Sequence, residues 1–442
     1  MDMHHLLHWI YFKGLARALR ELNMSRLFFS VVFLSLMYLA QRFWFIRVWR
    51  LTDSIRQPKR KILLRGFLAT AVALLLATIL DPFGHFTGHS SPGNWVFSAS
   101  KLWLLASSFG FLAVLTVGAV GWLSRLLMYA VPSAKREGFD PARRAFLRYA
   151  VFLSGSIPFM ATAYGFASER FRYHIEKVEV PIANLPKNLE GLRIVQLSDI
   201  HIGDFMPRLE VRRAVEMANK LNADLVVVTG DFISRDDDPI QDCISELSRL
   251  RAPLGIWGCN GNHEVYTEME DRSQKLFQQY GMRLLRQESA ELQWHGGKIN
   301  LIGVDYQGGR RFSGKERQLL HGTDSLIRKD IPNILLSHNP NTFYRAAELG
   351  IELSLAGHTH GGQVGIEIVD HQWSPARFVT KFVAGPYYLP LGNDAHSGEY
   401  GATSPGPKSA ALYVNRGLGT FGMPVRLGVP PEITLLTLRS AI

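Results

Sequence analysis

Cysteine is nearly absent from this 442-residue chain, which contains only Cys243 and Cys259. The two do not form a Cys-x-x-Cys pair, so a cysteine-based metal site is excluded. One disulfide could form in an oxidising compartment, but we expect two unpaired, buried thiols. The chain also lacks internal repeats and low-complexity runs. Its length predicts two or more domains.

Acidic residues are scarce in the first third of the chain. Residues 1–150 contain 19 of the 49 Lys and Arg but only 6 of the 38 Asp and Glu, so the net charge of +11 arises there. This basic third is also the most apolar part of the chain. Such a pattern is typical of charges that flank membrane segments, not of a nucleic-acid groove. We therefore expect a membrane as a partner and no nucleic-acid binding.

Charged residues are almost missing from four apolar segments before residue 170. A membrane span needs about 20 apolar residues, which the last two segments provide most clearly. The segments are 27–41 (extending to 46 if Arg42 reaches the interface), 62–80, 102–124 and 149–167. They predict an α-helical membrane region over residues 1–170 with about four transmembrane helices. Residues 5–22 could form an amphipathic helix on the membrane surface.

Lys and Arg residues between the segments predict the orientation. They gather in 47–61 and 135–148, whereas 81–101 is nearly uncharged. Because cytoplasmic loops carry the excess of basic residues, residues after 167 should lie outside. The stretch Arg143–Arg148 resembles a twin-arginine export signal, although an ordinary positive flank is the alternative. We expect a multi-pass protein of the cell (inner) membrane with an extracytoplasmic soluble domain.

Residues 171–442 alternate short apolar runs with amphipathic stretches. This alternation predicts an α/β domain with helices packed outside the sheets. The expected strands are 192–197, 224–229, 255–258, 299–304, 333–337 and 352–356, and the expected helices are 208–221, 240–250 and 272–280. Residues 392–407, rich in Gly, Ser and Pro, predict a loop or lid.

Polar, potentially metal-ligating residues follow five of the expected strands. They are Asp199 and His201, Asp231, Asn262 with His263, His338, and His358 with His360. Each alone could be a cap or turn residue. Because strand carboxyl ends meet at one crevice of an open α/β sheet, we expect these side chains to converge. Carboxylate, imidazole and amide oxygen are ligands of divalent first-row metals, and the set is too large for one tetrahedral ion. Two ions about 3.5–4 Å apart would clamp a phosphoryl centre and activate water.

The ordered motifs DIH, GD, GNHE, SH and GHTH, within residues 190–365, resemble the calcineurin-like metallophosphoesterase superfamily. The tail 413–438 resembles its membrane-anchored bacterial branch, related to a twin-arginine-exported phosphoesterase. The resemblance implies a four-layer α-β-β-α sandwich and two divalent ions such as Mn, Fe or Zn. It implies that Asp199, His201 and His360 ligate one ion, that Asn262, His338 and His358 ligate the other, that Asp231 bridges both, that His263 lies beside the substrate phosphate, and that Glu264 orients His263. One departure is Ser234, where many relatives carry an acid; it puts in doubt only a contact behind the ligands.

The function implied is a membrane-anchored phosphoesterase that hydrolyses a phosphomonoester or phosphodiester by a metal-activated hydroxide. A lipid headgroup is one candidate substrate. One alternative is a UDP-2,3-diacylglucosamine pyrophosphatase of lipid A synthesis, whose nucleotide substrate requires a cytoplasmic domain. Another is a metal-containing binding protein without catalysis. The sequence leaves the substrate, the metal and the oligomeric state open.

Overall fold

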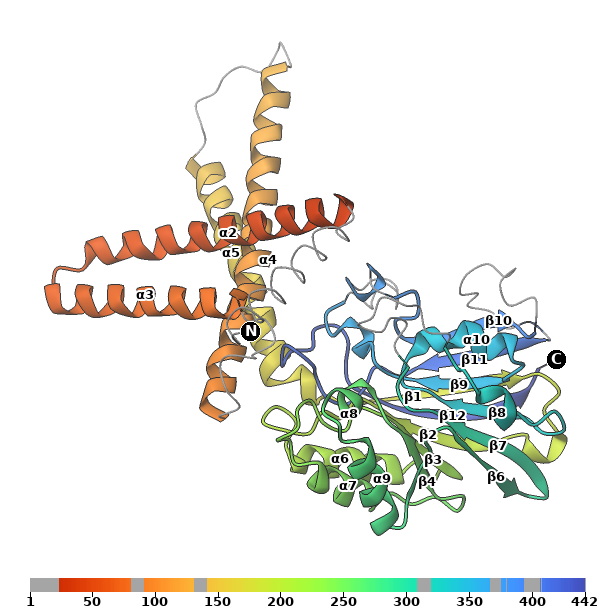
Figure 1. Cartoon of the computed structure of the whole chain (residues 1–442). Coiled ribbons are helices and arrows are strands. Elements are labelled where there is room, and N and C mark those ends of the chain that lie inside the picture. The colour runs from red at the N-terminus through yellow and green to blue at the C-terminus, as the bar shows by residue number, and fades with distance from the viewer. Residues whose placement is uncertain are drawn as a thin grey trace, which may run out of the picture. The chain divides into compact units, whose positions relative to one another are not determined.

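The computed structural model describes residues 24–80, 91–130, 141–307, 319–365, 375–378, 380–392, 406 and 408–441 (Figure 1). These residues belong to two compact units. The first unit comprises residues 1–88 and 95–162, and the second comprises 89–94 and 163–442. The amphipathic helix expected over 5–22 and nearly all of the loop expected over 392–407 lie outside the described residues.

The first unit is helical, and all four predicted apolar segments fall on its helices. These are α2 (Met24–Leu51), α3 (Pro58–Leu80), α4 (Ser91–Ala130) and α5 (Pro141–Ala167). Among the described residues, Trp95–Ser124 and Tyr149–Phe171 are long and apolar enough to cross a membrane. That α2 and α3 also cross it stays a prediction. Gln41 on α2 donates a hydrogen bond to Ser107 on α4 (2.8 Å), as polar residues between membrane helices commonly do.

The second unit contains two six-stranded sheets, drawn in Figure 1. The first sheet has the order β1-β12-β2-β3-β4-β5 and the second β10-β11-β9-β8-β7-β6. The strands of the first sheet are β1 (His174–Ile182), β12 (Glu432–Ser440), β2 (Arg193–Leu197), β3 (Leu225–Thr229), β4 (Ile256–Cys259) and β5 (Arg283–Leu284). Those of the second are β10 (Gly385–Pro390), β11 (Ser409–Val414), β9 (Leu353–Ala356), β8 (Asn333–Leu336), β7 (Gly297–Gly303) and β6 (Glu288–Trp294).

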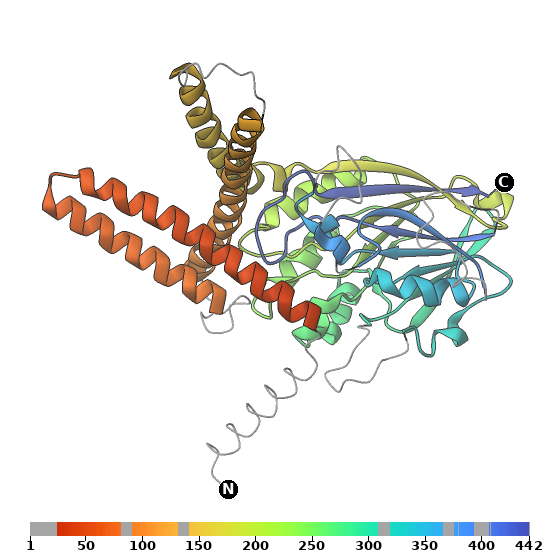
Figure 2. The same cartoon turned by 90° about the horizontal axis from the view of Figure 1, so that it is seen from above.

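Helices cover the outer face of each sheet (Figure 2). The helices α6 (Arg208–Asn219), α7 (Ile240–Leu247) and α9 (Glu270–Gln279) share one core with the first sheet, and α10 (Phe343–Glu348) packs on the second. A separate core lies between the sheets, where Ile194 and Val227 meet Leu301 and Leu355. Alternate residues of β2 and β3 serve the two cores, because successive side chains of a strand point to opposite faces. The predicted four-layer α-β-β-α sandwich is confirmed.

Parallel pairing brings the important strand ends to one edge of each sheet. Strands β2, β3 and β4 pair in parallel, as do β7, β8 and β9. All six predicted strands are present, whereas β1, β5, β6, β10, β11 and β12 were not predicted. The strand β1 alternates exposed and buried residues and contains Pro181, so it lacks the continuous apolar run that revealed the central strands.

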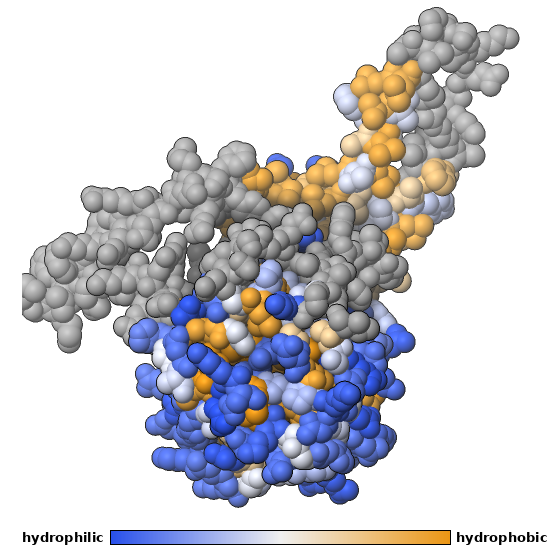
Figure 3. Space-filling model, turned by 90° about the vertical axis from the view of Figure 1, so that its right-hand side faces the viewer, coloured by the Kyte–Doolittle hydropathy of each residue, from blue (hydrophilic) through white to orange (hydrophobic). Residues whose placement is uncertain are grey.

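The surface of the second unit differs in hydropathy from the helices of the first. The face shown in Figure 3 is mainly hydrophilic, with scattered apolar patches, whereas the visible helices are largely apolar. Both cysteines are free and buried, Cys243 on α7 and Cys259 on β4. The contrast is what a water-exposed domain and lipid-exposed helices require.

Candidate metal centre

Loops that follow β2, β3, β4, β8 and β9 converge on one buried cluster of His and Asp side chains. Three groups each place their nitrogen or oxygen atoms within 4.8 Å of one another: Asp199, His201 and His360; His201, Asp231 and His263; and Asp231, His338 and His358. Asp231 and His201 each belong to two groups. The two sheets therefore supply adjoining halves of one site.

The backbone at this cluster adopts a conformation that is rare for residues with side chains. Asp199, His201, Asp231, His358 and His360 all have positive φ, between 49° and 76°. Such positions cost free energy and cluster at functional sites, where the surrounding fold holds them. Glycine makes the close packing possible here: a Cβ at Gly357 would collide with the Asp199 carboxylate, and one at Gly261 with Asp231.

The first group surrounds Asp199. His360 Nε2 lies 3.3 Å from Asp199 Oδ1 and 3.1 Å from His201 Nε2. His201 Nδ1 faces the carbonyl oxygen of Ile233 at 3.1 Å, which fixes the proton on Nδ1. The Nε2 lone pair of His201 is then directed at the other members of the group.

The second group lies on the other side of Asp231. His338 Nε2 is 3.0 Å from Asp231 Oδ2, and its Nδ1 faces the carbonyl of Thr229 at 2.6 Å. His358 Nδ1 lies 2.7 Å from the amide oxygen of Asn262. The structure thus brings Asn262 to this group, although its amide was the least distinctive of the predicted ligands.

These groups fit divalent cations. In both, Nδ1 of a histidine donates to a carbonyl, so that Nε2 faces carboxylate or imidazole acceptors inside the protein. Buried acceptors that face one another are unfavourable unless a cation or a proton lies between them. Nitrogen and oxygen donors held by carbonyl groups behind them are the usual surroundings of Zn, Mn or Fe. The ligand roles of the seven residues stay a prediction.

The electrostatics of the cluster follow from burial and from its two carboxylates. Burial raises the pKa of Asp199 to about 6. Burial opposes the charge of His338 as well, but Asp231 and Asp199 outweigh it and raise the pKa of His338 to about 10. Burial lowers the pKa of His201 to about 3 and that of His358 to about 4. These two rings are therefore neutral near pH 7, the state in which imidazole binds a metal.

His263 lies next to the ligand groups and is held by Ser234. His263 Nδ1 faces the Ser234 carbonyl oxygen at 2.9 Å, and the Ser234 hydroxyl lies 2.9 Å from His201 Nδ1. Ser234 therefore contacts both imidazoles, where an acid was expected in many relatives. The Asp238 carboxylate accepts the backbone N–H of Ser234 (2.7 Å) and so fixes this loop.

The role expected for Glu264 does not match its contacts. Its carboxylate accepts backbone N–H groups of Gly261 (2.8 Å), Asp231 (2.9 Å), Phe232 (2.8 Å) and Ile233 (3.3 Å), so it joins the loops after β3 and β4. The Ser234 carbonyl, not Glu264, faces the His263 ring. Burial and the charge of Asp231 raise the pKa of Glu264 to about 7. Glu264 is a framework residue of the site, because the short helix α8 (Asn262–Tyr266) directs its side chain back toward these N–H groups.

Aromatic residues that the sequence did not single out surround the cluster. Phe421 lies 4.6 Å from the His263 ring and 5.8 Å from the His201 ring, and Tyr306 lies 5.4 Å from His358 (ring centroids). Tyr266 lies 6.2 Å from His263. Phe421 belongs to a glycine-rich stretch near the C-terminus, which was the one available signal. Nothing local links that stretch to the histidines.

Comparisons with known proteins agree with this site. Residues 192–362 match the family described as calcineurin-like phosphoesterase. The chain is 28% identical over 365 residues to "Transmembrane protein with metallophosphoesterase domain" of Danio rerio, an alignment covering 77% of this chain and 74% of that protein. It is 29% identical over 308 residues to the uncharacterized metallophosphoesterase YkuE of Bacillus subtilis (strain 168), covering 68% and 98%.

A third relative has a printed activity. The UDP-2,3-diacylglucosamine pyrophosphatase LpxG of Chlamydia trachomatis serovar D is 28% identical over 305 residues, with 57% of this chain and 86% of that protein covered. The link to a twin-arginine-exported branch stays a prediction. From the match over both metal-site loops and from these relatives, the chain carries a calcineurin-like metallophosphoesterase domain and belongs among the hydrolases of that family.

Proposed function

We propose that this chain is a membrane-anchored phosphoesterase that holds two divalent metal ions, Mn, Fe, Zn or similar, and hydrolyses a phosphomonoester or phosphodiester. The observation that carries the proposal is the pair of ligand groups on either side of Asp231. Asp199, His201 and His360 would hold one ion, Asn262, His338 and His358 the other, and Asp231 would contact both. When bound, such ions activate water and neutralise charge on phosphoryl oxygens.

His263 is the residue of this chain that we assign to the substrate. The Ser234 carbonyl holds Nδ1, so the ring keeps a fixed orientation beside Asp231, whose Oδ1 accepts the His263 backbone N–H (3.0 Å). From there the imidazole can donate a hydrogen bond to a phosphoryl oxygen or a proton to the leaving oxygen. In the reaction, the oxygen of water forms a bond to phosphorus, the ester P–O bond breaks, and the leaving oxygen takes up a proton.

The proposed location is the cell (inner) membrane, with several spans and the catalytic domain outside the cytoplasm. The candidate spans Trp95–Ser124 and Tyr149–Phe171 support the membrane, as do relatives named transmembrane proteins. The basic stretches 47–61 and 135–148 support the orientation, because such stretches favour the cytoplasmic side.

A cytoplasmic UDP-2,3-diacylglucosamine pyrophosphatase is the second candidate, favoured by the similarity to the chlamydial enzyme over 86% of its length. It requires the opposite orientation. A reporter fused after Ile442 that is active only outside the cytoplasm contradicts this candidate. Activity only in the cytoplasm supports it.

A direct assay tests the proposed activity. The full chain in detergent, supplied with Mn²⁺, Fe²⁺ or Zn²⁺ in turn, should hydrolyse p-nitrophenyl phosphate or bis(p-nitrophenyl) phosphate. His263→Ala should lower turnover by about 10²–10⁴-fold without loss of bound metal, since positioned acid–base groups contribute that much. A wild-type protein that binds two ions but hydrolyses no phosphoester would contradict the proposal and support a non-catalytic metal protein.

A further inference from the structure

The C-terminal end of α5 is packed into the catalytic unit. We call residues 416–429 the strap, because they run between this helix end and the metal centre. The backbone N–H of Arg426 faces the carbonyl of Gly165 (3.4 Å), and the N–H of Gly428 donates to the Glu169 carboxylate (3.0 Å). A Cβ at Gly165 would collide with the Arg426 carbonyl. The last turns of the candidate span Tyr149–Phe171 are thus fixed to the strap.

The strap is in turn fixed to the loop that carries Asp199. Leu418 N–H donates to the carbonyl of Ser198 (2.9 Å), and Gly419 N–H donates to that of Asp199 (2.8 Å). The buried Arg426 guanidinium closes the strap on itself through the carbonyls of Arg416, Gly417 and Gly419 (2.7, 3.0 and 2.6 Å). A rigid connection therefore runs from the membrane helix to a predicted metal ligand.

The strap is also joined to the loop that carries His358 and His360. Gln363 donates to the carbonyl of Phe421 (2.8 Å) and accepts its N–H (2.9 Å). Leu427 N–H donates to the carbonyl of Gln363 (2.8 Å). These bonds fix the Phe421 ring beside His263 and His201.

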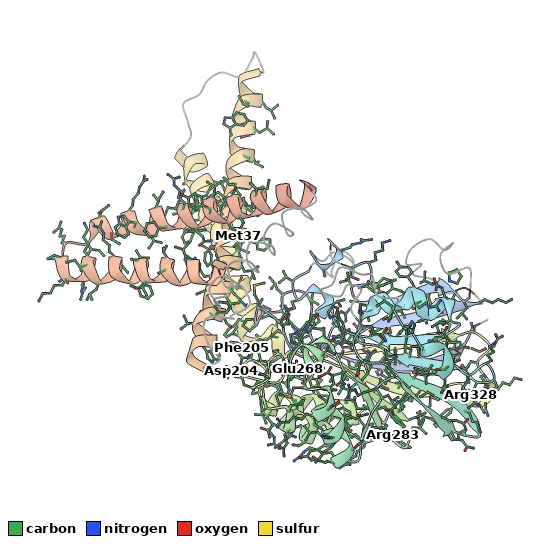
Figure 4. The ribbon with its side chains drawn as sticks, viewed as in Figure 1. Met37, Asp204, Phe205, Glu268, Arg283 and Arg328 are labelled. Atoms are coloured by element: carbon green, nitrogen blue, oxygen red, sulfur yellow. The ribbon has the colours of Figure 1, made fainter. Side chains whose placement is uncertain are left out.

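The loop after His201 contacts the same helix end directly. Arg170 donates to the carbonyl of Phe205 (2.7 Å), and the Phe166 and Phe205 rings lie 6.5 Å apart. Figure 4 shows Asp204 and Phe205 beside the C-terminal end of α5. The metal centre is consequently assembled against the point where the candidate span ends.

Exposed apolar side chains of the catalytic unit are found near the same places. Among the described residues after 171, the large exposed ones are Leu209 (68%), Tyr266 (67%), Phe421 (42%) and Tyr280 (37%). Tyr266 and Phe421 both neighbour His263. Leu209 lies one turn before Arg213, whose guanidinium donates to the carbonyl of Phe171 (3.4 Å). Exposed aromatic and aliphatic groups beside a span are suited to the membrane–water interface.

We propose that the phosphoester hydrolysed at this centre is carried by a lipid of the leaflet from which α5 emerges, and that it reaches the metals past Phe421 and Tyr266. The inference rests on the proposed phosphoesterase function. A site fixed to the end of a span meets lipid headgroups without diffusion through water. The two aromatic rings offer apolar contact to the part of the lipid next to the phosphate, whereas a small hydrophilic ester would gain nothing from them.

The test compares lipid-borne and soluble esters of the same chemistry. The full chain in phosphatidylcholine nanodiscs is assayed on phosphatidic acid against glycerol 3-phosphate, and on phosphatidylglycerol against glycerophosphoglycerol. We expect one lipid to have at least about a tenfold higher kcat/KM than its soluble counterpart, because binding of the remote apolar part contributes to the rate. Phe421→Ala should lower that ratio.

A matched pair of surface variants separates membrane contact from chemistry. Leu209→Asp should reduce hydrolysis of the lipid several-fold while p-nitrophenyl phosphate is hydrolysed as before. Tyr280→Asp, an exposed apolar residue at the end of α9, should change neither. Equal effects of Leu209→Asp on both substrates would overturn the inference.

The remaining outcomes distinguish this inference from the proposed function. Hydrolysis of p-nitrophenyl esters without preference for either lipid overturns the inference, while the phosphoesterase function stands. Absence of turnover on every ester overturns both.

Discussion

Two clusters of buried carboxylates in the catalytic unit are satisfied in opposite ways. On α7, the buried Glu246 carboxylate accepts from Arg208 (2.6 Å) and Arg212 (2.8 Å). At the metal centre, the carboxylates of Asp199 and Asp231 face imidazole rings instead. Arginine is a permanent cation, whereas the imidazoles of His201 and His358 are neutral near pH 7.

The difference separates structure from function. The charge of Glu246 is neutralised by the protein itself, so this cluster holds α6 and α7 together and needs no ligand. The charge at the metal centre is left for an external cation, so its residues should govern activity more than folding. The predictions below break one cluster or the other, from the largest expected effect to the smallest.

Asp231→Asn should lower turnover by about 10³-fold or more, because Asp231 lies in both ligand groups and an amide cannot supply the negative charge. The fold should persist, since an Asn side-chain oxygen can still accept the backbone N–H of His263. Turnover and bound metal are measured on the purified full chain, with thermal unfolding as the control. Full activity in this variant would contradict the two-metal assignment.

His360→Ala and His358→Ala should each remove mainly one ion, because the two rings belong to different groups. Turnover should fall about 10²-fold or more in both, since a two-metal site needs both ions. Elemental analysis of metal per chain gives the answer. If either variant loses both ions, or neither loses any, the division of the ligands is wrong.

Glu246→Gln should destabilise the catalytic unit by about 2 kcal/mol, because it leaves two arginines without their charged partner. Activity of the folded variant should equal that of the wild type. For a unit of this size the melting temperature should fall by about 2–4 °C per kcal/mol. A large loss of activity at full stability would show that this cluster does more than support the fold.

The same variant gives a pH test. Hydrogen bonds from Arg212 and Arg208, with the charges of their guanidinium groups, outweigh partial burial and lower the pKa of Glu246 to about 2 from a usual value of 4.5. The folded-state pKa is the lower one, so the stabilisation is present above about pH 4.5 and is lost as pH falls toward 2. The difference in melting temperature between wild type and Glu246→Gln should shrink over that range. A difference that is constant from pH 7 to 3 would contradict this account.

Ser234→Ala should have the smallest effect, about a two- to fivefold loss of turnover, since one neutral hydrogen bond contributes about 1 kcal/mol. The variant loses the hydroxyl contact to His201 but keeps the Ile233 carbonyl behind that ring and the Ser234 carbonyl behind His263. Ser234→Thr, which retains the hydroxyl, is the control. Kinetics at saturating metal distinguish this small effect from loss of an ion.

The sequence by itself determined the elements whose signal is local. Each central strand is a short apolar run, and each run ends in the Asp, Asn or His residues that later meet at one edge. Residue type limited the chemistry, because carboxylate and imidazole are the ligands of such metals. Those properties belong to neighbours in the chain, so periodicity and order sufficed to predict them.

Only the tertiary structure decided which distant residues touch. Glu264 bonds to backbone N–H groups of the loop after β3 instead of to His263, because both loops are brought together by parallel pairing of β3 and β4. The strap joins Gly165 to Asp199 across segments far apart in the chain. Contacts of this kind depend on how layers pack, and no periodicity within a segment encodes them.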